Sequence, residues 1–530
     1  MFVSSETVRL LMPELVLMVA GTLICVGGAF VRNRSLWSMV AQLAFVVAGG
    51  CMITFVPHGD ALQAGPVLMD GFAISLRWLL LVAGVFFTSL AWQSASRELS
   101  AEHVGLVMFA VVGAMLSVSA GDLIMLFLGL ELISIPTYAL LFIGRRDRDS
   151  AEAAGKYFFL SILSSALLLY GMSFVYGLGG TTAFLGNEAQ PGLRTVLAGM
   201  QASPLAALAP VAMLLIMVGL GFKLAAVPFH FYAPDVYQGT TAGNAAILAT
   251  LPKIAASAGI VRMVMLALPL QAHDAWKVML VMSLLSMTLG NVCALWQKNV
   301  RRMLAYSSIA HSGYMLIGMT VAQAGISLGG EQMYQGIAGL VFYIAVYTFG
   351  SLGSFAALAA MGRGGREIQG IDELAGMGRT QPLPAAALAI FMFSLAGIPP
   401  LAGFWGKFTL FISAIGLAMQ PLGAISTWMI ALAVCGALNA AIGAAYYLRI
   451  VGVMYFQPGS SHAPQPTQPG GALAATLACA ILVIAAGVWP SSVMRGAHSA
   501  EESIRGELRN EMAVQKSLAK EAIAIAKQDR

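Results

Sequence analysis

The stretch Gly219-Leu-Gly-Phe-Lys-Leu-Ala-Ala-Val-Pro-Phe-His230 places a lysine, two glycines and a proline inside an apolar segment. A lysine at the centre of a membrane-spanning helix costs about 3 kcal/mol on insertion scales. A segment that only anchors the chain in the membrane would therefore not be expected to contain a lysine such as Lys223. Glycine and proline interrupt helices, and interrupted helices occur in membranes where the freed backbone lines a polar cavity. The stretch predicts a broken spanning helix with an ionisable group beside the break.

A second apolar stretch has the same character and ends on a lysine. It is Ser394-Leu-Ala-Gly-Ile-Pro-Pro-Leu-Ala-Gly-Phe-Trp-Gly-Lys407. Interrupted segments in corresponding positions of two halves of a chain indicate the site of a membrane transporter. The separation of Lys223 and Lys407 nearly equals that of Glu131 and His311. This spacing predicts an internal repeat.

The rest of the chain is apolar enough to lie almost entirely in a membrane. Of the 530 residues, 58% are hydrophobic and 10% are charged, whereas soluble domains carry about 25% charged residues. Apolar stretches long enough to span the bilayer are centred near residues 20, 46, 82, 112, 133, 168, 220, 256, 286, 312, 347, 400, 440 and 481. We predict an all-α polytopic membrane protein with about 14 transmembrane helices, two inverted five-helix repeats and two broken helices.

These helices divide the chain into five predicted parts. They are residues 1–103 with helices 1–3, residues 104–268 with the first repeat (helices 4–8), residues 276–456 with the second repeat (helices 9–13), residues 457–496 with a linker and helix 14, and residues 497–530 as a tail. An odd number of helices in each repeat makes the second repeat inverted. Apolar residues recur in the tail at helical spacing. This pattern predicts an amphipathic helix on the membrane or on a neighbouring subunit, with a flexible solvated tail as the alternative.

Lysine and arginine are concentrated in the connections that follow odd-numbered helices. These residues are Arg32, Arg34, Arg97, Arg145, Arg146, Arg148, Lys156, Lys298, Arg301, Arg302, Arg363, Arg366 and Arg379. The even-numbered connections carry mainly Arg194, Arg262 and Lys277. By the positive-inside rule, the odd connections are cytoplasmic and both termini are periplasmic. The first apolar segment has no small-residue cleavage site and is expected to be a retained helix rather than a signal peptide.

Four ionisable residues lie deep in predicted helices and are the candidate proton-transfer groups: Glu131, Lys223, Lys253 and Lys407. A carboxylate such as Glu131 remains charged in a membrane when a cation is near. The functional interpretation is a Glu131–Lys223 pair whose strength changes during a transport cycle. The alternative is a static ion pair that holds helices together. A buried lysine can lose its proton near neutral pH, which suits Lys253 and Lys407 to carrying protons.

Two histidines are candidate relay groups. His311 follows Ser307 and Ser308 in a predicted helix, and histidine titrates near neutral pH. A lone histidine in a helix is more often a satisfied core residue, and that alternative remains open. His230, with Tyr232, is a candidate extension of the polar path towards the cytoplasm. Three further cations near helix ends are expected to be snorkelling anchors, namely Lys156, Arg262 and Arg449.

Signals for cofactor, metal and soluble-enzyme sites are missing from the sequence. The five cysteines are Cys25, Cys51, Cys293, Cys435 and Cys479. They are isolated in apolar segments, without the paired spacing of zinc, iron–sulfur or disulfide frameworks. The chain also has no phosphate-binding loop, no H-E-x-x-H and no G-x-S-x-G motif. We predict no metal and no cofactor in this chain.

Several motifs together resemble the antiporter-like subunits of respiratory complex I. The resemblance covers about residues 10–456 and is carried by Gly129-Leu-Glu-Leu-Ile-Ser-Ile-Pro, Lys156-Tyr-Phe, Gly221-Phe-Lys with Val-Pro-Phe-His, Pro234-Asp-Val-Tyr-Gln-Gly, Leu304-Ala-Tyr-Ser-Ser-Ile-Ala-His and Ala396-Gly-Ile-Pro-Pro-Leu-Ala-Gly-Phe. Met12-Pro-Glu-Leu, the Lys156-Tyr-Phe-Phe-Leu run and a lysine at position 407 make the subunit N family the most similar.

This resemblance implies proton pumping driven by quinone reduction elsewhere in a complex. It assigns Glu131 and Lys223 as the modulating pair, Lys253 as the central carrier and Lys407 as the carrier of the second half. It also implies that NADH, FMN, iron–sulfur clusters and quinone are bound by other subunits. The expected partners are the membrane-arm subunits M, K, J, L, A and H and the lipid bilayer, without nucleic acid. The expected location is the bacterial cell (inner) membrane.

One segment departs from the family pattern, and two other functions remain open. Thr240-Thr-Ala-Gly-Asn-Ala-Ala stands where the family has a proline-rich stretch, so the entry to helix eight is expected to differ. The first alternative function is a cation/proton antiporter subunit of a multi-subunit exchanger. The second is a passive spacer in the membrane arm, in which the buried lysines are dispensable.

Overall fold

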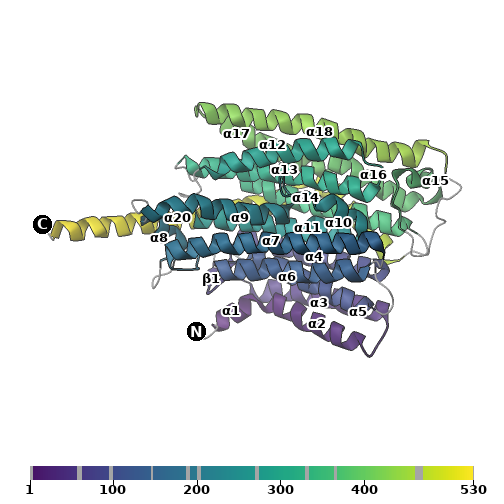
Figure 1. Ribbon diagram of the computed structural model, residues 1–530, viewed down its shortest axis with the longest axis horizontal. Coiled ribbons are helices and arrows are strands. Elements are labelled where there is room, and N and C mark those ends of the chain that lie inside the picture. The colour runs from purple at the N-terminus through teal and green to yellow at the C-terminus, as the bar shows by residue number, and fades with distance from the viewer. Residues whose placement is uncertain are drawn as a thin grey trace.

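The computed structural model describes residues 4–56, 62–94, 99–144, 147–186, 191–199, 204–268, 274–328, 333–362, 367–459 and 470–528. These residues form a bundle of helices that run side by side, with both chain termini at the same end (Figure 1). In the described part, the only sheet is a hairpin of β1 (Leu62–Ala64) and β2 (Val67–Met69), with Leu62 opposite Met69. The predicted all-α class is confirmed.

Among the described residues, ten helices are long and apolar enough to cross a membrane. They are α3 (Arg34–Phe55), α4 (Gly71–Ser94), α5 (Ser100–Val118), α6 (Leu123–Gly144), α7 (Arg148–Gly179), α11 (Ala242–Ile260) with its π-helical continuation η2 (Val261–Ala267), α12 (Ala275–Leu295), α14 (Gly336–Met361), α18 (Ala424–Phe456) and α19 (Gly471–Val488). Four shorter apolar helices are α2 (Met12–Gly28), α9 (Ala209–Leu224), α16 (Pro382–Ala396) and α17 (Ala402–Ala418). The long α13 (Val300–Ser327) packs along α12. Every predicted span thus corresponds to one of these helices or to a helix pair.

Short elements complete the described chain. They are α1 (Ser5–Leu10), α8 (Leu193–Gly199), η1 (Pro204–Leu208), α10 (Ala233–Gly239), η3 (Ile371–Leu374), α15 (Met377–Thr380) and the long C-terminal α20 (Pro490–Gln528). Residues 460–469, which belong to the predicted linker between helices 13 and 14, lie outside the described residues.

Both predicted helix breaks are present. α9 ends at Leu224, and the chain becomes helical again at Ala233 in α10. α16 ends before Gly397, which has a φ of 92°, and α17 starts at Ala402. Glycine adopts this left-handed conformation without steric cost, which explains a glycine at that position. Each break lies in the fourth span of a predicted repeat. The inverted relation of the two repeats stays a prediction.

Small residues bring the helices around Glu131 into close contact. A Cβ on Gly113 of α5 would lie 2.7 Å from the carbonyl oxygen of Gly129 of α6. A Cβ on Gly129 would lie 2.6 Å from Ser117 Oγ. Helices in membranes associate through such close backbone packing, because no hydrophobic effect drives them together in lipid. This packing fixes the position of the helix that carries Glu131.

The C-terminal helix begins earlier than predicted and packs on its own chain. α20 starts at Pro490, so it runs through the predicted boundary at residue 497. Ile504 and Leu508 are buried, and Glu501 accepts hydrogen bonds from the backbone N–H groups of Gln335 and Ala338 at the start of α14. The far end of α20 projects beyond the bundle (Figure 1). The side chains of residues 511–530, which carry part of the predicted apolar pattern, are outside the described set.

The prediction that Arg262 is a snorkelling anchor is wrong. Its side chain is 0% exposed and forms two hydrogen bonds with the carboxylate of Asp70, at 2.6 and 2.7 Å. An oxygen of Glu507 from α20 lies 3.7 Å from the same guanidinium. We call these three residues the Arg262 cluster. A carboxylate just before α4 and another near the C-terminus make burial of the arginine possible, and local sequence at Arg262 contains neither.

Candidate functional site

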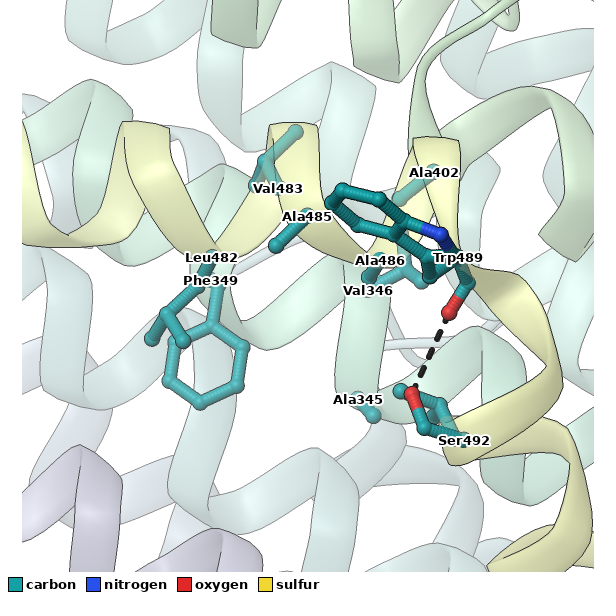
Figure 2. Close-up of a pocket in the computed structure, with 11 residues that line it drawn as sticks. Ala345, Val346, Phe349, Ala402, Leu482, Val483, Ala485, Ala486, Trp489 and Ser492 are labelled. Carbon is teal, nitrogen blue, oxygen red and sulfur yellow. Dashed lines mark hydrogen bonds between the residues drawn. The ribbon is translucent and has the colours of Figure 1, made fainter.

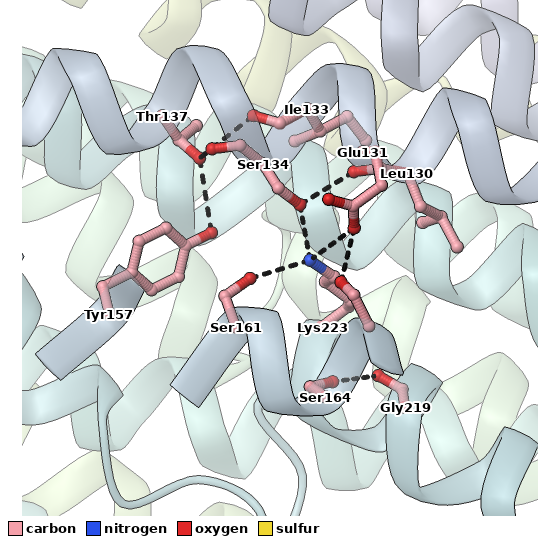
Figure 3. Close-up of polar contacts among 11 residues, drawn as sticks. Leu130, Glu131, Ile133, Ser134, Thr137, Tyr157, Ser161, Ser164, Gly219 and Lys223 are labelled. Atoms are coloured by element: carbon pink, nitrogen blue, oxygen red, sulfur yellow. Dashed lines mark hydrogen bonds and ion pairs between the residues drawn. The ribbon is translucent and has the colours of Figure 1, made fainter. Parts of the chain in front are cut away.

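Lys223 lies in the last turn of α9, beside the first break, and its side chain is 3% exposed. Its ammonium group donates hydrogen bonds to Ser134 of α6 and Ser161 of α7, the latter at 2.9 Å (Figure 3). Hydroxyl groups from two neighbouring helices therefore solvate this charge in place of water.

Glu131 lies next to Lys223 but is not in direct hydrogen-bond contact with it. The distance from Lys223 Nζ to Glu131 Oε1 is 3.9 Å, and the glutamate side chain is 22% exposed. Ser165 of α7 donates a hydrogen bond to the same carboxylate. Figure 3 shows the ammonium group between the carboxylate and the serines. The predicted neighbours are thus brought together in a loose arrangement that a small movement would tighten or open.

Coupling between these two groups is testable with a double-mutant cycle in proton pumping. We expect Glu131→Gln and Lys223→Ala to lower pumping each, and the double variant to lower it by much less than the sum. Residues that act as one unit show coupling of about 0.5–3 kcal/mol. The cycle is measured as initial proton uptake per NADH in membranes. Additive effects would show that the two groups work separately.

Lys253 lies in α11, is 1% exposed and caps the broken end of α9. Its ammonium group donates to the carbonyl oxygen of Leu224 at 2.7 Å, to that of Ser308 at 3.0 Å, and to the hydroxyl of Ser312. The last carbonyls of a helix have no partner within the helix, and the C-terminal end of the helix dipole attracts cations. Lys253 thus supplies both the missing donors and the opposite charge.

Lys407 makes the same kind of contact at the second break. It lies in α17, is 5% exposed, and donates to the carbonyl oxygens of Leu395 at 2.8 Å and Ala396 at 3.0 Å. Both carbonyls belong to the last turn of α16. The ammonium group also lies 4.9 Å from the ring centroid of Tyr314, where a cation–π interaction is favourable. Each half of the chain therefore has a buried lysine on the C-terminal end of a broken helix.

His311 lies between the two capping lysines and contacts tyrosines that sequence reasoning missed. Its Nδ1 is 2.5 Å from the hydroxyl of Tyr343, and its Nε2 is 2.9 Å from that of Tyr447. Towards Lys253, the hydroxyl of Tyr347 donates to Ser308 at 2.8 Å. The spacing of Tyr343 and Tyr347, one helix turn apart, places both on one face of α14. That spacing is the available sequence signal, but it does not identify the facing helix.

His230 is not brought together with this row. It lies in the connection between α9 and α10 and is partly buried. Its Nδ1 has no hydrogen-bond partner among the described residues. Tyr232 donates to the carbonyl oxygen of Phe222 at 3.1 Å and stacks on its ring. A relay role for His230 stays a prediction.

The half-helix α10 is fixed by charge pairs from two long helices. Asp235 accepts hydrogen bonds from Lys156 of α7, at 2.7 Å, and from Arg302 of α13. The side chain of Lys156 is 41% exposed, which agrees with its predicted place near a helix end. Desolvation by burial is the largest single influence on the pKa of Asp235, and it raises this pKa. The hydrogen bonds from Lys156 and Arg302 together outweigh desolvation, so the pKa of Asp235 is lowered. The carboxylate therefore stays charged and holds α10 in place.

The unusual Thr240–Ala246 stretch forms a well-defined start for α11. Thr241 caps the helix by accepting a hydrogen bond from the backbone of Asn244 at 3.3 Å. The carboxylate of Glu367, which pairs with Arg301, accepts from the backbone N–H of Ala242 at 3.0 Å. Asn244 also donates to the carbonyl oxygen of Leu140 at 2.7 Å. The different entry to this helix is thus closed by caps and hydrogen bonds in place of prolines.

These contacts join the ionisable groups into one buried row. Along the row, Lys253 caps the carbonyl oxygen of Leu224, the residue after Lys223, and donates to the carbonyl oxygen of Ser308. The rings of Tyr347 and Tyr314 contact His311, and Lys407 lies against Tyr314. Each member can donate or accept a proton or a hydrogen bond. Within the described residues, no group of three histidine, cysteine or acidic side chains is arranged to hold a metal ion. The arrangement suits proton movement along the middle of the bundle.

Comparisons with known proteins identify the family to which the chain is similar. Residues 120–437 match the family described as NADH:quinone oxidoreductase/Mrp antiporter, TM. NADH-quinone oxidoreductase subunit N of Rhodospirillum rubrum is 38% identical, covering 93% of this chain and 96% of that protein. The subunit of the same name from Paramagnetospirillum magneticum is 36% identical, covering 90% and 93%.

Solved structures give the same picture. A chain of respiratory complex I from Thermus thermophilus superposes with a TM-score of 0.73 at 31% identity, covering 91% of this chain and 99% of that one. A chain of the Mrp complex from a Dietzia species superposes with a TM-score of 0.78 at 20% identity, covering 96% and 99%. At that identity, the second likeness concerns the fold alone.

Proposed function

The chain belongs to the NADH-quinone oxidoreductase subunit N family, and on this premise we propose that it is a proton-translocating membrane subunit of respiratory complex I. Quinone reduction elsewhere in the complex drives proton transfer through Glu131, Lys223, Lys253, His311 and Lys407. The observation that carries the proposal is the pair of buried lysines on the ends of the two broken helices. A static bundle would not need charges there, and apolar side chains would avoid the insertion cost.

The capping contacts connect protonation to the position of each half-helix. A protonated Lys253 is held by the carbonyl of Leu224, and this carbonyl loses its strongest donor when the lysine becomes neutral. The same change at Lys407 weakens its hydrogen bonds to the carbonyls of Leu395 and Ala396, because a neutral amine donates without the positive charge. Charge interactions are strong at low dielectric. Loading one lysine therefore favours unloading of its neighbour, because two like charges are costly in the same apolar region.

The histidine and tyrosine groups provide the connection between the two lysines. His311 has a tyrosine hydroxyl on each ring nitrogen, so one nitrogen can accept a proton while the other releases one. Tyr347 and Ser308 extend the connection towards Lys253. Tyr314 borders Lys407 at the other end. These groups mark the proposed route of a proton between the two lysines, in which the links from His311 to Tyr347 and to Tyr314 are ring contacts rather than hydrogen bonds.

The setting of the chain follows from the same premise. We place it in the bacterial inner membrane with both termini periplasmic, beside the other membrane-arm subunits M, K, J, L, A and H. NADH, FMN, iron–sulfur clusters and quinone are then bound by other subunits. A cation/proton exchanger subunit shares the fold. The higher identity to subunit N relatives, 38% against 20% for the Mrp chain, favours the complex I assignment.

Replacing Lys223 tests the proposed role directly. We expect Lys223→Ala to lower proton uptake per NADH strongly while native gels show an assembled complex. The matched control is Lys277→Ala, because Lys277 is 59% exposed at the start of α12 and lies outside the buried row. Positioned proton-transfer groups contribute roughly 10²-fold to rate, so the expected loss is large. Wild-type uptake by the Lys223→Ala complex would contradict the proposal and favour the passive spacer.

A further inference from the structure

A cavity of about 310 Å³ lies between α14, α17, α19 and the start of α20. Its lining is almost entirely apolar, and the indole ring of Trp489 lies across its edge, as Figure 2 shows. Trp489 is 69% exposed, so this edge faces the outside of the isolated chain. The remaining lining includes Ala345 and Phe349 of α14, Ala402 of α17, Leu482 and Ala486 of α19, and Ser492 of α20.

The cavity reaches into the interior of the membrane region. Phe349 lies 13 residues beyond the first residue of α14, Gly336, which corresponds to roughly 20 Å at 1.5 Å per residue. Ala402 is the first residue of α17, directly after the second break. The backbone of Gly487 accepts a hydrogen bond from the indole of Trp405 at 2.9 Å and so ties α19 to the same region. At this depth, an opening on the outside of the bundle faces hydrocarbon rather than water.

A charged group lies one helix turn from the cavity. Arg495 follows Ser492 by three residues on α20, so both side chains lie on the same face of the helix. Arg495 is exposed. From the cavity, α20 leads towards the membrane surface, where Glu501 caps the first turn of α14. The apolar cavity therefore lies deeper in the membrane region, and Arg495 lies nearer to the membrane surface.

We propose that this cavity binds one acyl chain of an anionic membrane phospholipid, with the lipid phosphate at Arg495. The cavity matches a hydrocarbon chain in chemistry, and the guanidinium matches a phosphate in charge and geometry. The bound chain packs against Ala402, the first residue of the half-helix α17 that carries Lys407. This binding site is independent of the proton role of the lysines.

The test uses membranes that contain the whole complex and a phosphatidylglycerol probe with a photoreactive diazirine in its acyl chain. After illumination, labelled peptides of this chain are identified by mass spectrometry. We expect label on the segments 345–349 and 482–486. Ala486→Phe, which fills the cavity, should lower this label several-fold. Ala474→Phe on the exposed side of the same helix is the matched control and should leave it unchanged.

The headgroup is tested separately with Arg495→Gln. This variant should lower labelling by the phosphatidylglycerol probe several-fold and leave labelling by a zwitterionic phosphatidylcholine probe at its lower wild-type level. Equal labelling of wild type and Ala486→Phe would overturn the proposal. So would cross-links from the cavity to a neighbouring subunit, or a quinone recovered in place of phospholipid. Intact pumping with lost labelling would leave the proposed function standing, which keeps the two claims separable.

Discussion

Replacing Lys253 or Lys407 by arginine is expected to abolish proton transfer through this chain, although each substitution keeps the positive charge. Arginine does not lose its proton in proteins, so it can cap the broken helix but cannot carry a proton. Removing a positioned proton-transfer group costs roughly 10²-fold in rate. Lys253→Met and Lys407→Met should therefore be as inactive as the arginine variants. The measurement is initial proton uptake per NADH in membranes, with assembly shown by native gel.

The comparison between arginine and methionine separates two roles of these lysines. If charge on the helix end were sufficient, arginine would restore pumping and methionine would not. Normal pumping by Lys253→Arg and Lys407→Arg would contradict the hypothesis that these side chains gain and lose a proton during pumping. Lys277→Arg provides the control for a lysine on the surface. We expect each of the four variants at Lys253 and Lys407 to give a complex that assembles but does not pump.

Loss of Arg262 is expected to destabilise the fold rather than the proton path. Arg262→Met leaves the carboxylate of Asp70 buried without the guanidinium that donates two hydrogen bonds to it. Removing one partner of a buried charge pair typically costs about 3–5 kcal/mol. We expect less assembled complex on native gels and a lower melting temperature, while the complex that does assemble pumps normally per NADH.

Two variants test whether the buried charges are responsible. Arg449→Met is the matched control, because Arg449 is an arginine whose hydrogen bonds to Leu295 and Gln297 are exposed. A triple variant that replaces the whole cluster, Arg262→Met with Asp70→Leu and Glu507→Met, should recover most of the lost stability, since buried charge clusters can be replaced by apolar groups. An Arg262→Met complex as stable as wild type would show that the cluster contributes little.

Sequence reasoning predicted the site in part. Lys223, Lys253 and Lys407 were found because charge is costly in apolar helices, and this cost depends only on the neighbouring sequence. The tyrosines at 343 and 447 were not found, because tyrosine is common in membrane helices and carries no such cost. The role of Arg262 was interpreted wrongly, because a position near the end of a predicted helix favours a snorkelling side chain.

The sequence by itself determined the membrane class, the spanning segments and the two breaks. Length of apolar runs and the positions of glycine and proline are local properties, and the bilayer allows few alternatives to helices. Only the tertiary structure decided which groups meet. The capping of Leu224 by Lys253 joins α9 to α11, and the Arg262 cluster joins residues from both ends of the chain. Such contacts depend on how helices pack across long sequence separations, which the periodicity within each helix does not specify.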